Sequence, residues 1–192
     1  MTTVLAAIER ANEQLFGDAL ACEEVHPAVF LPGPVEATRL RAHLLQAEAL
    51  LRALAVVEDS PRNEESDPHI DAAFRRLEAK VDLLTALVAG FAAGQSTDPL
   101  RRLRWSARGV RMSHDAAFAP GTPGLFRVQA AEWLPSPLVL PATVLAAEAG
   151  VEPGSQSLWL RFEGLGPVLE AALERHLFRV HRRAVAESRR AG

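Results

Sequence analysis

The feature that most constrains this chain is a segment over residues 68–91 in which apolar residues recur at alternating gaps of four and three. An α-helix has about 3.6 residues per turn, so a sustained spacing of about 3.5 keeps one apolar stripe facing a partner helix. At about 1.5 Å per residue, the predicted helix is about 36 Å long, longer than a small domain requires. The stripe consists of Ile70, Phe74, Leu77, Val81, Leu84, Val88 and Phe91.

Residues 34–58 carry a similar stripe and predict a second helix that begins at Pro34, in the first turn where proline is tolerated. Its seam includes Leu40, Leu44, Leu51 and Leu54. A polar connection over residues 59–67 joins the two helices, so we expect an antiparallel hairpin. The hairpin either packs only on itself or gathers further copies. The length of the helices and the breadth of their apolar face favour homo-oligomerisation.

The remaining segments predict a small β-structure. We expect a short helix over residues 2–16 and one extended strand within residues 18–30. Extended runs over residues 100–112, 125–134, 138–147 and 157–162 are separated by short turns, which is typical of antiparallel strands in a barrel or sandwich. A last helix begins at Pro167, lies against the barrel and frays after residue 186. The predicted division is an N-terminal segment with a candidate first barrel strand (1–33), a helical oligomerisation insert (34–94) and the barrel with its helix (95–192).

Composition excludes several classes of protein. The 192 residues include 21 basic and 24 acidic side chains, a formal net charge of −3, which argues against nucleic acid or anionic lipid as the partner. The single cysteine, Cys22, excludes an internal disulfide framework and fits a reducing compartment. No apolar run approaches the ~20 residues of a membrane span. We therefore predict a cytoplasmic protein without a membrane span.

Candidate catalytic and metal-binding residues are few. Ser113, His114 and Asp115 are the residue types of a hydrolase triad, but triads are assembled from distant segments rather than adjacent residues. Cys22 and His26 lack companions at metal-ligand spacing. We predict no catalytic site, no metal site and no cofactor, and therefore a protein that is not an enzyme.

A local cluster of five arginines stands out in this slightly acidic chain: Arg101, Arg102, Arg104, Arg108 and Arg111. The favoured interpretation is a solvated strand edge whose charges deter edge-to-edge pairing. The alternatives are a surface for an acidic protein and a site for nucleotide phosphates. Binding of nucleic acid through this strand is a further alternative, and it predicts an affinity that depends steeply on salt.

A string that overlaps this cluster resembles a known family signature. Residues 105–112 read Trp-Ser-Ala-Arg-Gly-Val-Arg-Met, similar to the Asp/Asn-x-Ser-x-x-Gly strand segment of PilZ domains, with Ser106 and Gly109 in place. Residues 158–165 and 176–183 are also similar to that family. Within it, the chain resembles the atypical, tetramer-forming branch, in which two long heptad-bearing helices precede the signature. The resemblance implies an α+β fold: a PilZ-like antiparallel β-barrel with a C-terminal helix and an inserted two-helix coiled coil that forms a homotetramer through a helical bundle.

PilZ domains of the common kind bind cyclic di-GMP through an upstream Arg-x-x-x-Arg segment and through the Asp/Asn and Ser of the signature. Here Arg104 occupies the Asp/Asn position, and no Arg-x-x-x-Arg lies where the family has it. Losing two arginine contacts and one carboxylate, at roughly 1.5–3 kcal/mol each, would weaken binding by about 10²- to 10⁴-fold or more. The expected ordinary binding motif is therefore largely lost.

We predict a non-enzymatic protein of bacterial cyclic di-GMP signalling that acts as an oligomeric scaffold or adaptor toward an unidentified signalling protein. Roles in motility, pili or virulence follow by analogy with related proteins. The alternative is a genuine cyclic di-GMP receptor that uses the segment 101–111. The candidate ligand-binding residues are Arg101, Arg102, Arg104, Ser106, Arg108 and Gly109.

Overall fold

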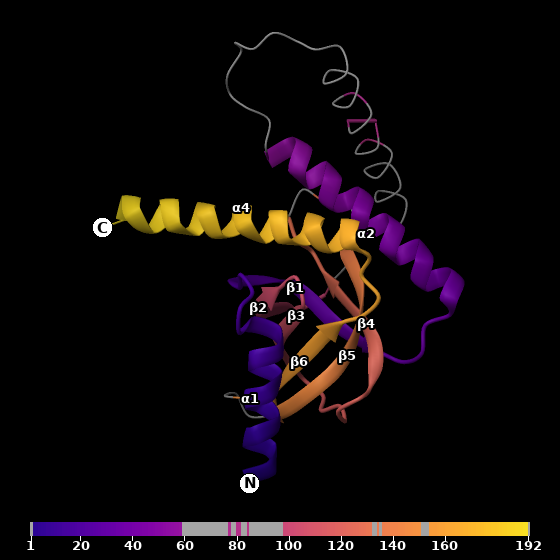
Figure 1. The fold of residues 1–192 in the computed structure, drawn as a ribbon, viewed down its shortest axis with the longest axis vertical. Coiled ribbons are helices and arrows are strands. Elements are labelled where there is room, and N and C mark those ends of the chain that lie inside the picture. Colours follow the sequence, from indigo (N-terminus) through magenta and orange to yellow (C-terminus); the bar gives the residue numbers. More distant parts are fainter. Residues whose placement is uncertain are drawn as a thin grey trace.

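The computed structural model describes residues 2–58, 77, 80, 81, 84, 98–131, 134, 136–150 and 154–191. The helices are α1 (Thr2–Phe16), α2 (Ala37–Glu58) and α4 (Pro167–Ala191). The strands are β1 (Cys22–Pro32), β2 (Leu100–Ser106), β3 (Gly109–His114), β4 (Pro123–Val128), β5 (Leu138–Ala149) and β6 (Gln156–Phe162). These strands form a closed antiparallel barrel in the order β1-β2-β3-β6-β5-β4. In Figure 1, α1 stands beside the barrel, α4 crosses one end of it and α2 packs across α4.

Strand β1 closes the barrel because its two halves pair with different neighbours. Its first half pairs with β2 and its second half, from Ala28 to Pro32, pairs with β4. Ala28 and Phe30 are buried in the main core. The sequence predicted this strand within residues 18–30, but it begins at Cys22 and runs on through Leu31 and Pro32. The difference arises because Leu31 and Pro32 pair with β4 rather than forming a turn.

The segment 100–112 forms a hairpin rather than a single extended run. Ser106, the last residue of β2, pairs with Gly109, the first residue of β3, and Ala107 and Arg108 make the turn between them. A Cβ at Gly109 would lie 2.1 Å from the carbonyl oxygen of Leu160 in β6. Only glycine therefore lets β3 lie this close to β6, which explains the glycine of the Ser-x-x-Gly string.

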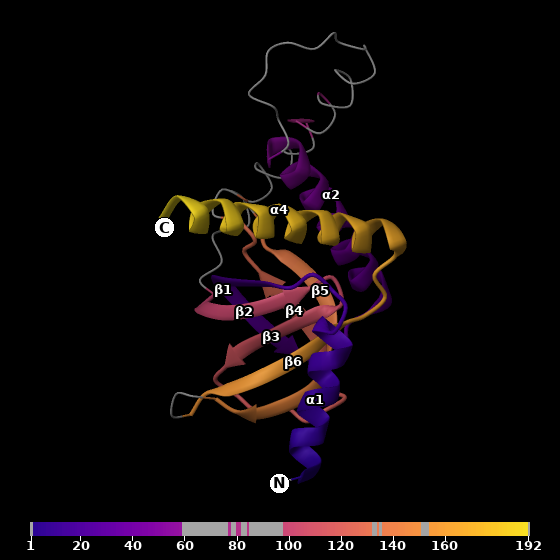
Figure 2. The same cartoon turned by 60° about the vertical axis from the view of Figure 1, so that its left-hand side comes forward.

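Helix α4 seals one end of the barrel through the apolar face that the sequence predicted. Its Leu169, Leu173 and Leu177 are buried in the main core together with barrel and α2 residues. The helix begins at Pro167 as predicted, and the N–H of Glu170 donates to the carbonyl of Gly166 at 3.0 Å. It does not fray after residue 186 but continues to Ala191, beyond the barrel (Figure 2).

Helix α2 differs from its predicted form in two respects. It begins at Ala37 rather than Pro34, because the first turn is set by the N–H of Leu40 donating to the carbonyl of Glu36 at 2.9 Å. Two members of its predicted seam, Leu51 and Leu54, are buried in the main core of the chain, where α2 packs against α4 and β5. These two leucines therefore stabilise the monomer and present no free seam. Of the other members, Leu44 packs against the same core and Leu40 is half-buried.

The predicted helix over residues 68–91 is described at four positions. Leu77, Lys80, Val81 and Leu84 are helical, and the three apolar ones are 58 %, 51 % and 60 % exposed. Ile70, Phe74, Val88 and Phe91 lie outside the described residues. The coiled coil thus stays a prediction. Among the helices of the described ranges, none combines the length and the apolar character needed to cross a membrane.

Candidate functional site

The candidate site is the outer face of the β2–β3 hairpin, where two arginines lie directly opposite each other. Arg104 of β2 is the cross-strand partner of Arg111 of β3. The guanidinium of Arg104 lies 4.7 Å from the centre of the Phe16 ring, and that of Arg111 lies 5.1 Å from the Trp159 ring. A cation–π contact at an exposed site is worth about 0.5–1 kcal/mol, similar to the repulsion between like charges on facing strands. The rings therefore hold both arginines in place.

The other arginines of the cluster point elsewhere. Arg101 forms a bidentate pair with Asp115, in which Nη1 donates to Oδ1 at 2.8 Å. Arg108, in the hairpin turn, pairs with Asp18 at 2.5 Å. Hydrogen bonds from these arginines hold the pKa of Asp115 and of Asp18 below the ordinary value. Arg102 is exposed and forms no ion pair with the part of the chain that the structure describes.

The predicted ligand contact Ser106 is engaged inside the protein. Its side chain is fully buried, and its hydroxyl donates to the carbonyl of Leu15 at 2.7 Å. The same oxygen accepts the backbone N–H of Arg108 at 3.1 Å. Carbonyls in the last turn of a helix lack intrahelical partners. Ser106 therefore supplies a hydrogen-bond donor to a carbonyl at the end of α1 and also holds the hairpin turn in place.

Helix α1 and the connection after it lie against the Ser-x-x-Gly part of the signature string, which the sequence did not predict. Leu15 is fully buried, and its Cδ2 atom would lie 2.7 Å from a Cβ at Gly109. Asn12 accepts a hydrogen bond from Nε1 of Trp159 at 2.9 Å. Phe16 lies under Arg104, and Asp18 holds Arg108. Each residue of the string that was singled out for ligand binding thus touches α1 or the connection after it: Arg104, Ser106, Arg108 and Gly109.

The contact between α1 and the barrel forms a hydrophobic cluster separate from the main core. It buries Ala11, Leu15 and Phe16 of α1 with Ala146 and Trp159 of the barrel. The sequence signal for this contact is the spacing of Ile8, Ala11 and Leu15, which marks one apolar face of α1 but not its target.

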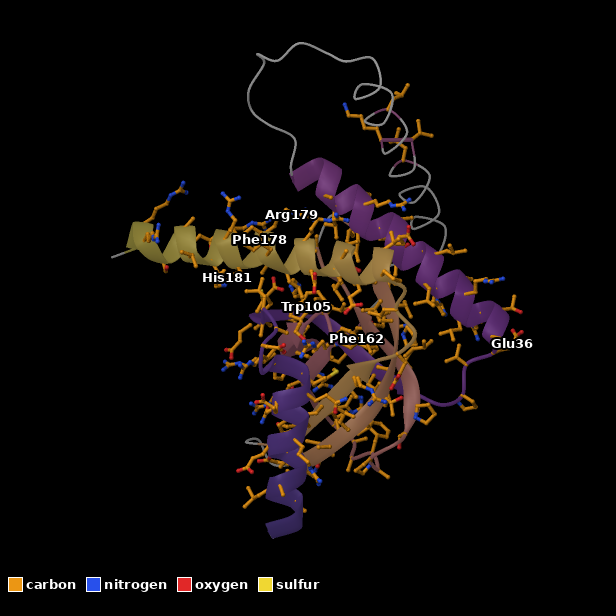
Figure 3. The ribbon with its side chains drawn as sticks, viewed as in Figure 1. Glu36, Trp105, Phe162, Phe178, Arg179 and His181 are labelled. Carbon is orange, nitrogen blue, oxygen red and sulfur yellow. The ribbon has the colours of Figure 1, made fainter. Side chains whose placement is uncertain are left out.

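A second polar cluster lies beneath α4. Nε1 of Trp105 donates to Oε2 of Glu24 at 2.8 Å, and Nε2 of His26 lies 3.1 Å from Oε1. The ring of His176 meets that of Trp105 edge-on, with the centroids 5.8 Å apart. Figure 3 shows Trp105 under the helix and Arg179 on the side of α2. Burial by itself raises the pKa of Glu24, but the hydrogen bonds from His26 and Trp105 outweigh it, so this pKa is lowered.

The residues considered for catalysis or metal binding are placed apart. Asp115 pairs with Arg101, whereas Nδ1 of His114 accepts the backbone N–H of Ala116 at 3.0 Å. Sγ of Cys22 donates to the carbonyl of Leu177 at 3.2 Å. Burial, and then the charge of Glu24, raise the pKa of Cys22 to about 11, so the thiol is protonated at neutral pH. Within the described ranges, no three His, Cys, Asp or Glu side chains are placed to hold a metal ion.

Comparison with known proteins identifies the family. Residues 51–190 match the family model described as "Atypical PilZ domain, cyclic di-GMP receptor". The chain belongs to the atypical PilZ family. This PilZ domain is 38 % identical to a pathogenic protein from Xanthomonas campestris, with a TM-score of 0.73 over 97 % of this chain and 99 % of the other. That protein is described as a tetrameric PilZ domain self-assembled via an unusual helical bundle.

A second similar structure is the PilZ domain of YcgR from Escherichia coli with cyclic di-GMP. It is 17 % identical, with a TM-score of 0.36, and the match covers 49 % of this PilZ domain and 82 % of the other chain. A search of curated protein sequences finds no match.

Proposed function

We propose that this PilZ protein is a non-enzymatic, oligomeric scaffold or adaptor of cyclic di-GMP signalling, in which ordinary nucleotide binding has been lost. The observation that carries the proposal is the position of α1 on the signature string of the β2–β3 hairpin. A cytoplasmic location agrees with its single, buried cysteine, Cys22. The proposed organisation keeps the helical insert at residues 34–94 between the N-terminal segment and the main part of the barrel.

A nucleotide that used the family's contacts would have to displace α1. Both hydrogen-bonding roles of the Ser106 hydroxyl are taken, and Leu15 covers Gly109. Exposing Leu15 and Phe16 would remove about 3–6 kcal/mol of apolar burial, which lowers affinity by about 10²- to 10⁴-fold. This penalty adds to the missing Arg-x-x-x-Arg segment and to Arg104 at the Asp/Asn position. Intramolecular contacts thus replace the ligand on this surface.

Titration calorimetry of the full chain with cyclic di-GMP tests the loss of binding. We expect no saturable heat at micromolar nucleotide. The opposite result would be binding at micromolar affinity or tighter that is abolished by Arg102→Ala or Arg104→Ala. That result would support a genuine receptor that uses the segment 101–111. Arg161→Ala is the matched control, because Arg161 lies on β6, outside that segment, and its guanidinium pairs with Glu163 two residues further along the chain.

The oligomeric part of the proposal is supported by the exposed apolar residues of the helical insert. Leu77, Val81 and Leu84 are each more than half exposed, at a spacing that places them on one face. The description of the related Xanthomonas protein supports a tetramer formed through a helical bundle here as well. Replacing Leu77 and Leu84 by glutamate should convert the assembly to monomers in analytical ultracentrifugation. The control is glutamate at Ala79 and Ala86, which the heptad register places opposite the seam, and an unchanged mass for the leucine variant would contradict the assembly.

A further inference from the structure

The outer face of α4 carries a second stripe with heptad spacing. The helix buries Leu169, Leu173 and Leu177 toward the barrel. On the opposite side, seven residues follow one another at alternating gaps of three and four, a spacing that keeps them on one face of a helix. We call these residues the outer stripe: Val168, Ala171, Arg175, Phe178, Arg182, Val185 and Arg189.

The outer stripe faces solvent. Val168 and Phe178 are each 53 % exposed, although large apolar side chains are usually covered. The guanidinium of Arg182 lies 6.0 Å from the centre of the Phe178 ring. Arg175, Arg182 and Arg189 are exposed and form no ion pair with any residue that the structure describes. Much of the stripe extends past the barrel, because the C-terminal half of α4 projects beyond it (Figure 1).

The charge of this part of α4 is opposite to that of the rest of the chain. Residues 175–191 contain six arginines and one glutamate, a formal charge of +5. Because the whole chain carries −3, the remaining residues carry −8. Residues 175–191 therefore form a local positive surface on an acidic protein, and this surface would attract an acidic partner.

We propose that the outer stripe is a docking surface for an acidic α-helix of a partner protein. A helix that packs along a heptad stripe contacts the two repeating positions of the stripe in turn, which here are the arginine position and the apolar position. Carboxylates on the partner would face Arg175, Arg182 and Arg189, and apolar side chains would cover Phe178 and Val185. This inference rests on the proposed adaptor function and names the surface and the kind of partner that it uses.

Other occupants fit the stripe less well. A second copy of α4 would place arginine against arginine across a parallel seam, which opposes pairing. A membrane-bound helix needs a broad apolar face, whereas the projecting half of the stripe offers only Phe178 and Val185. A nucleic-acid backbone would contact the arginines but leave the apolar members uncovered.

The test uses the full-length protein and a fluorescent three-heptad peptide with glutamate at the first and leucine at the fourth position of each heptad. Fluorescence anisotropy should show saturable binding, and a peptide with lysine in place of glutamate should not bind. Phe178→Ala and Arg182→Glu should each weaken binding about tenfold or more, as expected for central contacts. Arg190→Glu is the matched control, since it makes the same charge change off the stripe, and it should alter affinity by less than about twofold.

Five results would overturn the inference. If Arg182→Glu and Arg190→Glu lower the affinity for the peptide equally, the binding is charge attraction without a docking face. If the lysine peptide binds, charge complementarity is excluded. The protein could instead bind vesicles of phosphatidylglycerol and phosphatidylcholine, or duplex DNA, more tightly than it binds the peptide. If Arg182→Glu abolishes that binding, the stripe is assigned to a membrane or to nucleic acid. A lower sedimentation mass for Phe178→Ala would show that a second copy covers the stripe. If the peptide fails to bind while the oligomer remains intact, this inference fails and the scaffold function stands.

Discussion

Replacing Leu15 by alanine should release α1 from the barrel without unfolding the barrel. Leu15 is fully buried and belongs to the small cluster formed with Trp159, separate from the main core. Truncating a buried leucine to alanine typically costs about 2–5 kcal/mol. Because the lost contacts lie between α1 and the barrel, most of this free energy should appear in the docking equilibrium of α1.

Hydrogen exchange followed by mass spectrometry measures that equilibrium directly. A loss of 2–5 kcal/mol corresponds to an exchange rate about 30- to 5,000-fold faster for the amides of the second half of α1. Amides of β5 and β6 should keep their protection, because their exchange requires opening of the barrel. The hydroxyl of Ser106 loses its acceptor on Leu15 when α1 leaves. The variant should therefore also raise any residual affinity for cyclic di-GMP.

Leu5→Ala is the matched control, because it makes the same change in the same helix at a side chain that is 58 % exposed. Substitutions at exposed positions usually change stability by less than about 0.5 kcal/mol. The reasoning is refuted if Leu5→Ala and Leu15→Ala accelerate exchange equally, or if Leu15→Ala destabilises α1 and the barrel to the same extent.

Three further predictions concern the barrel. Gly109→Ala should lower the melting temperature strongly, because the new Cβ would lie 2.1 Å from the backbone oxygen of Leu160, and a calorimetric scan that matches the wild type would contradict this packing. The lowered pKa of Glu24 means that its carboxylate stabilises the fold above its ordinary value of 4.5, and that this stability is lost as the pH falls through the folded pKa. Urea unfolding should therefore show a smaller loss of stability on acidification for Glu24→Gln than for the wild type, and parallel losses would exclude this role. Burial is the main cause that raises the pKa of Cys22 to about 11, so its thiol should resist iodoacetamide at neutral pH in the folded protein and react in urea. Mass spectrometry measures the extent of alkylation, and rapid alkylation of the folded protein would be inconsistent with the burial of Cys22.

Local pattern was sufficient to predict several elements. The helix over residues 2–16 and the start of α4 at Pro167 follow from apolar periodicity and from proline in the first turn. The alternation of Leu158, Leu160 and Phe162 placed β6 correctly, because these three side chains all enter the main core, although Trp159 on the other face is also buried, against α1. These signals depend on residues a few positions apart.

Contacts between distant segments were not predictable in the same way. The stripe of α2 contains Leu51 and Leu54, and nothing in their spacing distinguishes packing on α4 from packing on another chain. Arg104 and Arg111 were grouped with Arg101 and Arg108 because they are close in sequence. The barrel sends each to a different partner, since the position of Phe16, Trp159, Asp115 and Asp18 depends on the closed topology.

The β1 strand ties two otherwise separate parts of the molecule to a common frame. The chain reaches β1 from α1, the helix on the signature string, and leaves it toward α2, the first helix of the insert. Both halves are hydrogen-bonded, to β2 and to β4, so the strand cannot slide by a single residue without breaking two ladders at once. In the proposed assembly, β1 would therefore hold the α1-covered face of each copy at a fixed orientation to its α2 helix, and the copies would display these faces at constant mutual orientation.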